Sequence, residues 1–444
     1  MLKDGNPYSH TGKIRRKRRV PRIWNGTGEK MANLLILADD FTGAMDTVIQ
    51  FAKLGIQTEV GTDVAALLRS AKNAEVLMVD TETRHMTPED AYAKVYREAR
   101  AGYEAGIPFL YKKTDSALRG NVGAELSAAL AAWEGRSLPF VPAYPMMGRT
   151  TISGIHFING VPLAQSDFSN DLYSPVQCSD VVCLLQKQSR LPVIREGEPR
   201  PDTPFLEVYD AQTDSDLLAI ARALREKNET GIMAGCAGLA AVLPDILGLT
   251  SGTPVTVRGS GKLLVLCGSM HPVAKEQVHY AVKKGFCHVQ LTPAVKLGME
   301  ESAAARRELV VRIAALCRGD VPVIVDANDD NGETMAAAGA LGMTSEQVRD
   351  AVARSMGTIG ADLMKAGVNS TIFITGGDTL MGFLSAAGNC ALNPVLEILP
   401  GVVRAWLDID GRRLDVITKS GSFGDKRLFV SVAEYIRGEG KKTV

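Results

Sequence analysis

The stretch from Ile107 to Gly123 reads Ile-Pro-Phe-Leu-Tyr-Lys-Lys-Thr-Asp-Ser-Ala-Leu-Arg-Gly-Asn-Val-Gly. Its apolar start, Ile107 to Leu110, predicts a buried strand that delivers two lysines and Asp115 to a loop. Gly120 and Gly123 then allow backbone N–H groups to approach a ligand closely. We interpret the stretch as a strand that ends in a binding site for a small anion, rather than as a solvated strand end whose charges have no function.

The same alternation of short apolar runs and helical patterns extends along the chain on both sides. In the first half it predicts strands at Leu34–Ala38, Val76–Asp80, Ile107–Leu110, Phe140–Pro142 and Gly231–Ala234. In the second half it predicts strands at Leu263–Cys267, His288–Leu291, Val323–Asp326 and Thr371–Thr375, then shorter ones at Arg404–Leu407 and Leu414–Ile417. The fold class is therefore α/β, with largely parallel sheets flanked by helices.

Chain length and composition divide the protein into two domains. With 444 residues the chain is too long for one ordinary core. A stretch rich in Gly, Ser, Thr and Pro has no helical period and is typical of a linker. We predict an N-terminal domain over 31–250, a linker over 251–261 and a C-terminal domain over 262–444. Strand-end loops of the two sheets should then face each other across an interdomain cleft, where ligands of such sheets bind.

Charge is distributed unevenly although the total is balanced. Residues 1–30 hold nine of the 50 basic residues and two of the 50 acidic ones, which leaves 41 basic and 48 acidic residues for the body. The leader has no apolar segment and ends where the first strand is about to begin, so we expect a disordered tail or an upstream start codon rather than a nucleic-acid arm. An acidic body argues against a nucleic-acid partner, and no apolar run approaches the length of a membrane span.

Cysteine usage indicates a reducing compartment. The seven cysteines are scattered, without a C-x-x-C pair or clustered histidines: Cys178, Cys183, Cys236, Cys267, Cys287, Cys317 and Cys390. This pattern predicts reduced, mostly buried thiols in a cytoplasmic protein and no metal framework.

Two adjacent carboxylates, Asp39 and Asp40, stand where the first strand should end and the first helix begin. In the simplest interpretation Asp40 or Thr42 caps that helix, whose N-terminus favours an acid. A cap requires only one carboxylate. The other is then a candidate general base, which accepts a proton from a substrate hydroxyl during phosphoryl transfer.

Arg84 follows the strand at Val76–Asp80, and its guanidinium suits a carboxylate or a phosphate. Exposed arginines without a ligand are commoner, so Arg84 alone is a weak signal. The segment Gly148-Arg149-Thr150 has the same status.

Three glycine-containing turns follow strands in the second half. They are Cys267-Gly268-Ser269, Thr375-Gly376-Gly377-Asp378-Thr379 and Thr418-Lys419-Ser420-Gly421-Ser422-Phe423-Gly424. Glycines at a strand-to-helix turn expose N–H groups that can hold phosphate, although tight turns also use Gly for steric reasons alone. Three such turns in one domain favour a nucleotide. The chain contains no G-x-x-x-x-G-K-[ST], no G-x-G-x-x-G after a strand and no G-x-S-x-G.

Taken in order, these motifs resemble the four-carbon acid sugar kinase family. The segments that carry the resemblance are A-D-D-F-T-G-A at 38–44, K-K-T-D-S-A-L-R-G-N-V-G-A-E-L at 112–126, G-R-T at 148–150, D-A-Q-T-D at 210–214, G-C-A-G-L-A at 235–240, C-G-S at 267–269, T-G-G-D-T at 375–379 and K-S-G-S-F-G at 419–424. The resemblance covers roughly residues 31–432. Cys236 and Cys267 depart from it, since Ser is more usual at both positions.

The resemblance implies an ATP-dependent kinase that phosphorylates the terminal hydroxyl of a four-carbon sugar acid. It places the acid in the N-terminal domain, at Asp39, Asp40, Arg84, Lys112, Lys113, Thr114 and Asp115. It places ATP in the C-terminal domain, at Ser269, Gly376, Gly377, Asp378, Thr379 and Gly421, with Mg²⁺ expected to accompany ATP. Asp40, or else Asp39, is the expected base.

The resemblance implies D-threonate as the substrate and 4-phospho-D-threonate as the product. Family members that act on 3-oxo acids have a Cys-Ser-Thr-Phe-Asp-Ser type of segment at this loop, whereas this chain has Lys-Lys-Thr-Asp-Ser. D-erythronate and 3-oxo-tetronate are alternatives. A non-catalytic sensor of sugar acid and nucleotide would not need a base, so the two aspartates favour the enzyme, and the three turns argue against a synthase that uses no ATP. A homodimer is one option for the assembly state.

Overall fold

The computed structural model describes residues 32–70, 74–171, 174–249, 251–253, 260–299, 302–329, 331–388, 391–409, 411–419, 421 and 423–438. The basic leader, Cys390 and most of the predicted linker lie outside these residues, so what the sequence indicates about them stays a prediction.

The N-terminal half is a parallel sheet. Its strands are β1 (Leu34–Ala38), β2 (Thr58–Gly61), β3 (Val76–Asp80), β4 (Phe109–Lys113), β5 (Ser137–Val141), β9 (Val193–Arg195), β10 (Phe205–Val208) and β11 (Ile232–Gly235). They lie in the order β2-β3-β1-β4-β11-β5-β10-β9. A separate antiparallel sheet contains β6 (Arg149–Ile152), β7 (Ile155–Ile158) and β8 (Val161–Pro162), and short 3₁₀ turns span Pro145–Met147, Leu163–Gln165 and Asp167–Asn170.

The C-terminal half is a mixed sheet with five parallel strands among its described residues. These are β12 (Leu263–Cys267), β13 (Cys287–Gln290), β14 (Val323–Asp326), β15 (Thr371–Thr375) and β18 (Arg412–Lys419). Two antiparallel strands, β16 (Leu392–Leu399) and β17 (Val402–Ile409), complete it. Leu392 of β16 pairs with Val60 of β2, so the two halves join edge to edge into one sheet.

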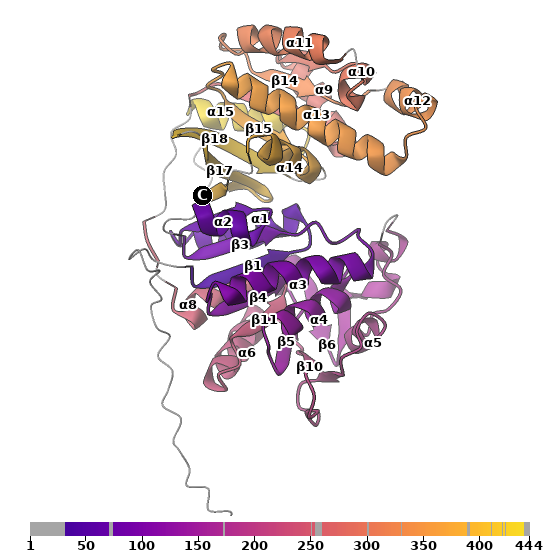
Figure 1. Ribbon diagram of the computed structural model, residues 1–444, viewed down its shortest axis with the longest axis vertical. Coiled ribbons are helices and arrows are strands. Elements are labelled where there is room, and N and C mark those ends of the chain that lie inside the picture. The colour runs from indigo at the N-terminus through magenta and orange to yellow at the C-terminus, as the bar shows by residue number, and fades with distance from the viewer. Residues whose placement is uncertain are drawn as a thin grey trace, which may run out of the picture.

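Helices cover both faces of this sheet (Figure 1). In the N-terminal half, one face is covered by α1 (Phe41–Ala52), α6 (Asp214–Glu226), α7 (Ala237–Ala240) and α8 (Leu243–Leu247), and the other by α2 (Val64–Ser70), α3 (Pro88–Glu104), α4 (Val122–Ala132) and α5 (Val181–Gln186). In the C-terminal half, α10 (Pro293–Leu297), α11 (Ser302–Leu316), α12 (Glu333–Ala340), α13 (Ser345–Lys365) and α14 (Gly377–Ala386) lie opposite α9 (Pro272–Lys283) and α15 (Leu428–Arg437).

One hydrophobic core continues from the N-terminal half into the C-terminal half. It contains Val48 of α1, Val60 of β2, Leu392 of β16 and Met356 of α13, all with 1% exposure or less. Burial of continuous apolar surface is the main stabilising contribution in such a junction. Within the described part of the chain, no helix combines the length and apolar character needed to cross a bilayer.

The α/β class and its largely parallel strands are confirmed, and the strands at Leu34–Ala38, Val76–Asp80, Leu263–Cys267, Val323–Asp326 and Thr371–Thr375 have the predicted bounds. The expected strand at Ile107–Leu110 was placed too early, since β4 begins at Phe109 and ends at Lys113. Pro108 has no N–H to donate to a neighbouring strand, so pairing begins after it. Lys112 and Lys113 therefore belong to the buried end of the strand rather than to the loop.

Helices α13 and α14 cross with glycines at their contact. A Cβ atom added at Gly357 would overlap the carbonyl carbon of Gly382, and one added at Gly382 would overlap the carbonyl oxygen of Ala353. The close approach matters for the site because α14 begins in the Thr375–Thr379 turn.

We expect Gly357→Ala to lower the free energy of unfolding by about 1–3 kcal/mol, because the helices must separate to admit the methyl group. Gly339→Ala on α12 is the matched control, since a Cβ there meets no described atom within 4 Å. Alanine is the better helix former by up to about 1 kcal/mol, so the control should be neutral or stabilising. Urea unfolding of the two variants checks the difference, and equal effects would contradict the packing argument.

Candidate active site

The first group of candidate residues lies at the carboxyl ends of β1, β3 and β4. Ala38 is in register with Asp80 on one side and with Lys113 on the other. The loops that carry Asp39, Asp40, Arg84 and Asp115 therefore begin side by side, which sequence separations of up to 76 residues do not reveal. We call this group the carboxylate–arginine cluster, and it consists of Asp39, Asp40, Arg84, Lys112, Lys113, Asp115 and Arg119.

Arg84 is the centre of the cluster. Its Nε donates to Asp39 Oδ2 at 2.8 Å, and its Nη1 donates to Asp40 Oδ2 at 2.6 Å. Its Nη2 lies 3.4 Å from Asp115 Oδ1. The fork of the guanidinium is thus occupied by three carboxylates of the protein itself, and a contact of Arg84 with the substrate stays a prediction.

Asp39 is 2% exposed, and its Oδ1 has no hydrogen-bond partner among the described residues. Burial by itself would raise the pKa of Asp39, but the charges of Arg84, Lys112 and Lys113 outweigh it and hold the pKa below its usual value. Asp39 is therefore a stable anion.

Asp40 caps α1, as the simplest interpretation of the sequence predicted. Its side chain accepts a hydrogen bond from the backbone N–H of Gly43 at 2.8 Å. Its side chain is also 23% exposed, against 3% for that of Asp39. Asp40 is accordingly the more accessible of the two carboxylates, and both bind Arg84.

Asp115 is bound by a second arginine. Arg119 Nε and Nη2 donate to the two oxygens of Asp115 at 2.8 and 3.0 Å. Burial opposes ionisation of Asp115, yet Arg84 and Arg119 hold its pKa well below the usual value. Arg119 was absent from the predicted site residues, although its spacing of four from Asp115 is the signal that would have found it.

The two lysines have different surroundings. Lys112 is fully buried, and its Nζ lies 2.7 Å from Glu125 Oε2 on α4. Lys113 Nζ donates to the carbonyl of Thr114 at 2.8 Å, and no carboxylate among the described residues forms an ion pair with it. A Cβ atom added at Gly43 would lie 2.6 Å from this ammonium, so a larger residue there would displace Lys113 where it passes the first turn of α1.

Of the two glycines in the Ile107–Gly123 stretch, only Gly120 can still have the ligand-facing role that the sequence predicted. Gly120 has a φ of +80°, and a Cβ atom there would lie 2.9 Å from the carbonyl oxygen of Arg84. The N–H of Gly123, however, donates to Gln188 Oε1 at 2.7 Å inside the protein. The expectation that Gly123 offers its N–H to a ligand is therefore wrong. Thr114 directly follows β4 and is buried. Its Oγ1 has no hydrogen-bond partner among the described residues.

Further carboxylates surround the cluster, and sequence reasoning missed their role. Burial and the charge of Glu82 raise the pKa of Asp80. Burial, with the charges of Asp378 and Asp40, also raises the pKa of Glu82, whose backbone is left-handed at φ 48°. On α1, burial raises the pKa of Asp46 to about 6, opposed by Lys113. Raised pKa values of this kind concentrate at functional sites.

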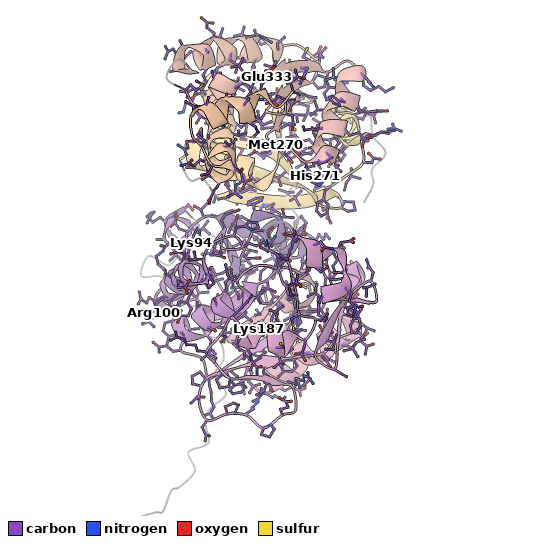
Figure 2. All side chains as sticks on the ribbon, turned by 90° about the vertical axis from the view of Figure 1, so that its right-hand side faces the viewer. Lys94, Arg100, Lys187, Met270, His271 and Glu333 are labelled. Carbon is purple, nitrogen blue, oxygen red and sulfur yellow. The ribbon has the colours of Figure 1, made fainter. Side chains whose placement is uncertain are left out.

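The second group of candidate residues lies at the carboxyl ends of β12, β15 and β18. A Cβ atom added at Gly421 would overlap Ser269 Oγ, and one at Gly376 would lie 3.5 Å from Ser269 Cβ and from Thr379 Oγ1. The three glycine-containing turns therefore converge, and we call them the three-turn cradle. The φ of Gly376 is +101°, which only glycine adopts readily. Met270 and His271 follow in the part of the C-terminal half next to the N-terminal half (Figure 2).

Asn328 supports the cradle from the loop after β14, and it was not predicted. Its Nδ2 donates to the carbonyl of Ser269 at 3.1 Å and to Asp326 Oδ1 at 2.8 Å. Its Oδ1 is buried and has no partner among the described residues. Asparagine after a strand is a frequent loop residue, so the sequence contained no distinctive signal for it.

The departures at Cys236 and Cys267 preserve their turns. Both residues are fully buried. The thiol of Cys236 donates to the carbonyls of Pro142 and Ala143 at 3.2 and 3.3 Å, as a serine hydroxyl would. In the described residues Cys178, Cys183, Cys236, Cys267, Cys287 and Cys317 are free thiols.

The cluster and the cradle meet where α1 and α14 begin. A Cβ atom added at Gly377 would lie 3.5 Å from Cβ of Phe41, the residue after Asp40. Beside this contact a cavity of about 890 Å³ is lined by residues of both halves, including Glu82, His85, Arg349 and Asp378. The N-termini of α1 and α14, each a site of positive partial charge, thus lie at the boundary between the two groups.

Two family models match the N-terminal and the C-terminal half of the chain separately. One family model, a sugar-binding N-terminal domain, matches residues 34–243, and another, a nucleotide-binding C-terminal domain, matches residues 264–429. A Salmonella typhimurium protein named D-threonate kinase is 30% identical over 91% of this chain and 98% of its own length. A Heliobacterium modesticaldum protein named D-erythronate kinase is 25% identical over 91% of this chain and 97% of its own.

A solved structure of a Haemophilus influenzae protein has the same fold, with a TM-score of 0.69 at 22% identity over 91% of this chain and 99% of that one. A sugar-binding domain joined to a nucleotide-binding domain defines the class: a two-domain α/β protein that brings a sugar-derived compound and a nucleotide together. The chain belongs to the four-carbon acid sugar kinase family.

Proposed function

We propose that this protein transfers the γ-phosphoryl group of ATP to the 4-hydroxyl of a four-carbon sugar acid, and that the acid is D-threonate. The observation that carries the proposal is the meeting of the carboxylate–arginine cluster with the three-turn cradle at Phe41 and Gly377. Phosphoryl transfer requires an acceptor hydroxyl, a base and a phosphate site in one place, with positive charge around them. The boundary has a carboxylate at Asp40, the start of α14 and the ammonium of Lys113, which supports a base, a phosphate site and positive charge beside the hydroxyl of a bound acid.

The cradle is the proposed nucleotide site. The N–H groups at the start of α14, Gly377 to Thr379, would bind phosphate oxygens at a positive helix end. Ser269 and Gly421 would form the opposite wall, because the three turns converge there. The acid would bind in the N-terminal half, which matches the sugar-binding family model.

Asp40 is the proposed base. It is the more exposed carboxylate of the pair, and it stands one residue before the contact with Gly377. A base must reach the hydroxyl proton within hydrogen-bond distance, which a carboxylate at the boundary can do. Asp39 and Asp115 are held as anions behind it, and we assign them the task of fixing Arg84.

Lys113 is the proposed partner of the substrate's negative charge. Its ammonium is buried and has no ion pair among the described residues, whereas Arg84 and Lys112 already bind carboxylates. A buried cation without an anion is costly, and a carboxylate or phosphoryl group of the ligand would relieve that cost. Arg84 and Lys112 then act by adding positive potential and by positioning the aspartates.

The residues at the boundary also fit Mg²⁺ that arrives with ATP. Asp80 Oδ2 is buried without a partner among the described residues, and the repulsion felt by Glu82 and Asp80 is of the kind that a cation relieves. Glu82 and Asp378 would hold the ion from the two halves, beside the cavity they both line. When bound, Mg²⁺ would neutralise charge on the phosphate oxygens.

The choice of D-threonate has two supports. The relative named D-threonate kinase is 30% identical, against 25% for the one named D-erythronate kinase. The chain also has Lys-Lys-Thr-Asp-Ser at 112–116. D-erythronate is the second candidate, because one inverted hydroxyl changes binding by only about 1–3 kcal/mol. We further propose a cytoplasmic location, where ATP is available and thiols stay reduced.

A panel assay tests this proposal. The protein with MgATP is offered D- and L-threonate, D- and L-erythronate and 3-oxo-tetronates, and ADP release and the phosphorylated product are measured. We expect the highest kcat/KM with D-threonate and a 4-phosphate product. Higher kcat/KM with D-erythronate would change the substrate but not the reaction. ATP binding without turnover of any acid would instead favour a sensor.

A further inference from the structure

Lys419 is a buried cation at the end of β18, and no role has yet been given to it. The residue is 5% exposed. Its Nζ donates to the carbonyl oxygens of Gly421 and Phe423 at 3.1 and 3.2 Å. Two N–H donors are thereby used, which is the number a neutral amine has, and a third proton would have no acceptor among the described residues.

The charged and titratable groups that face Lys419 do not neutralise it. On β12 and β14 these are Cys267, whose pKa is raised by burial and by Asp326, and Asp326 itself, which accepts from Asn328 and lies 3.1 Å from His288. The neighbouring segments carry His271, whose Cβ would lie 3.3 Å from a Cβ atom added at Gly421, Asp425 in the loop after β18, and Asp378 in the first turn of α14. Asp425 accepts from the N–H of Arg427, and His271 from that of Val273. In the described part of the chain, no carboxylate forms an ion pair with Lys419.

A row of polar side chains continues from Lys419 across the sheet beneath the cradle. Lys419 is in register with Thr375, which is in register with Cys267, which is in register with Asp326. Residues in register on parallel strands point to the same face. Thr375 Oγ1 and Asn328 Oδ1 are buried without partners among the described residues, so the cradle's floor lacks part of its hydrogen bonding.

We propose that the ammonium of Lys419 is the charge that holds the phosphate chain in the three-turn cradle, and that nucleotide binding is coupled to uptake of a proton by Lys419. This inference rests on the proposed nucleotide site. It adds Lys419, which is not among the predicted site residues, to the nucleotide site. It also adds a proton to the binding equilibrium. The proton comes from the buffer and is accepted by the nitrogen lone pair, and no covalent bond changes.

The physical reason is the opposing effect of burial and of a phosphate. Burial lowers the pKa of Lys419 to about 8 in the free protein, opposed by Cys267. A bound triphosphate places several negative charges nearby and raises that pKa again. Uptake on saturation should therefore be small at pH 7 and should rise toward one proton as the pH is raised to 9, because the neutral fraction of Lys419 before binding rises with pH.

Isothermal titration calorimetry with MgATP, in the absence of a sugar acid, measures this quantity. Titrations at pH 7, 8 and 9 in two buffers of different ionisation enthalpy give the number of protons taken up. MgATP itself is fully ionised over the upper part of this range. We expect uptake that rises with pH in the wild-type protein.

Two variants separate charge from proton exchange. Lys419→Arg keeps a permanent charge, so it should bind MgATP within a few-fold of wild type with no pH-dependent uptake. Lys419→Met should weaken binding at least tenfold. Lys284→Met is the matched control, since Lys284 lies at the other end of α9 over the ring of Tyr280, and its affinity and uptake should equal those of wild type.

The outcomes distinguish the inference from the function on which it rests. MgATP binding by wild type without pH-dependent uptake, or uptake by Lys419→Arg equal to wild type, would overturn the inference and leave the kinase proposal intact. No MgATP binding at millimolar concentration would overturn the proposed function itself. The wild-type titration decides the matter even where a variant does not fold.

Discussion

Asp40→Asn should lower kcat by at least about 10² while leaving the protein folded, as expected when a positioned general base is removed. The asparagine oxygen can still accept from the N–H of Gly43, because Asn caps helices as well as Asp does. The KM for ATP should change little, since the cradle lies in the other half. Steady-state kinetics with D-threonate, together with the melting temperature, measures both effects.

Asp63→Asn is the control for Asp40→Asn. Asp63 also accepts from a backbone N–H in a first helical turn, that of Ala66 at 2.6 Å, but it stands directly before α2, outside the cluster. This variant should have wild-type kcat. If Asp40→Asn retains nearly full kcat, the base is another carboxylate. Asp46 would be the first alternative, because burial raises its pKa to about 6, near the pH of the assay.

Arg84→Ala should produce the largest loss of stability. It leaves Asp39 and Asp115, both nearly buried, without their shared cation. Removing one partner of a buried ion pair typically costs about 3–5 kcal/mol. The urea midpoint at pH 7 should fall accordingly, and the folded fraction should show weakened affinity for the acid with little change for ATP. A rise confined to the KM for ATP would contradict the placement of the two ligands.

The loss of stability in Arg84→Ala should depend on pH. In the wild type the pKa values of Asp39 and Asp115 are below the unfolded value of 3.8, so their contribution to stability is present above that value and is lost as pH falls below it. Removal of Arg84 takes away a charge that lowers both pKa values, so the pKa of each carboxylate should rise in the variant. The stability difference between wild type and variant should therefore shrink as pH is lowered from 7 toward 3.

A surface arginine is the control. Arg100 pairs with Glu104 and Glu134 on the outside of α3, so Arg100→Ala should leave the midpoint nearly unchanged at every pH. A comparable loss from Arg100→Ala would show that the urea assay does not report on the cluster. A pH-independent loss from Arg84→Ala would attribute its effect to packing rather than to the carboxylates.

The chemical content of the site loops could be predicted from the sequence because it is local. An apolar run followed by Asp-Asp or by Gly-Gly-Asp indicates a strand end and its loop, whatever the neighbours are. The cap by Asp40 and the ends of β1, β3, β12, β14 and β15 are local in the same sense, and all are confirmed.

Elements that depend on distant partners were missed. Strand β16 carries Asn393, Pro394 and Glu397, which interrupt its apolar pattern, and it forms only because β17 and β2 lie beside it. The strands β9 and β10 are short runs that pair at one edge of the sheet. The sequence predicted that Gly123 binds a ligand, but its N–H donates to the side chain of Gln188, which is 65 positions away in the chain.

By itself, the sequence determined the α/β class, the family and the residue types at each strand end, because periodicity and turn chemistry act over a few residues. Only the tertiary structure decided which charges neutralise one another. It showed that Arg84 holds three carboxylates, that Lys112 is paired with Glu125 while Lys113 and Lys419 have no described ion pair, and that Phe41 meets Gly377. Coulomb interactions depend on distance and burial in space, and separation along the chain specifies neither.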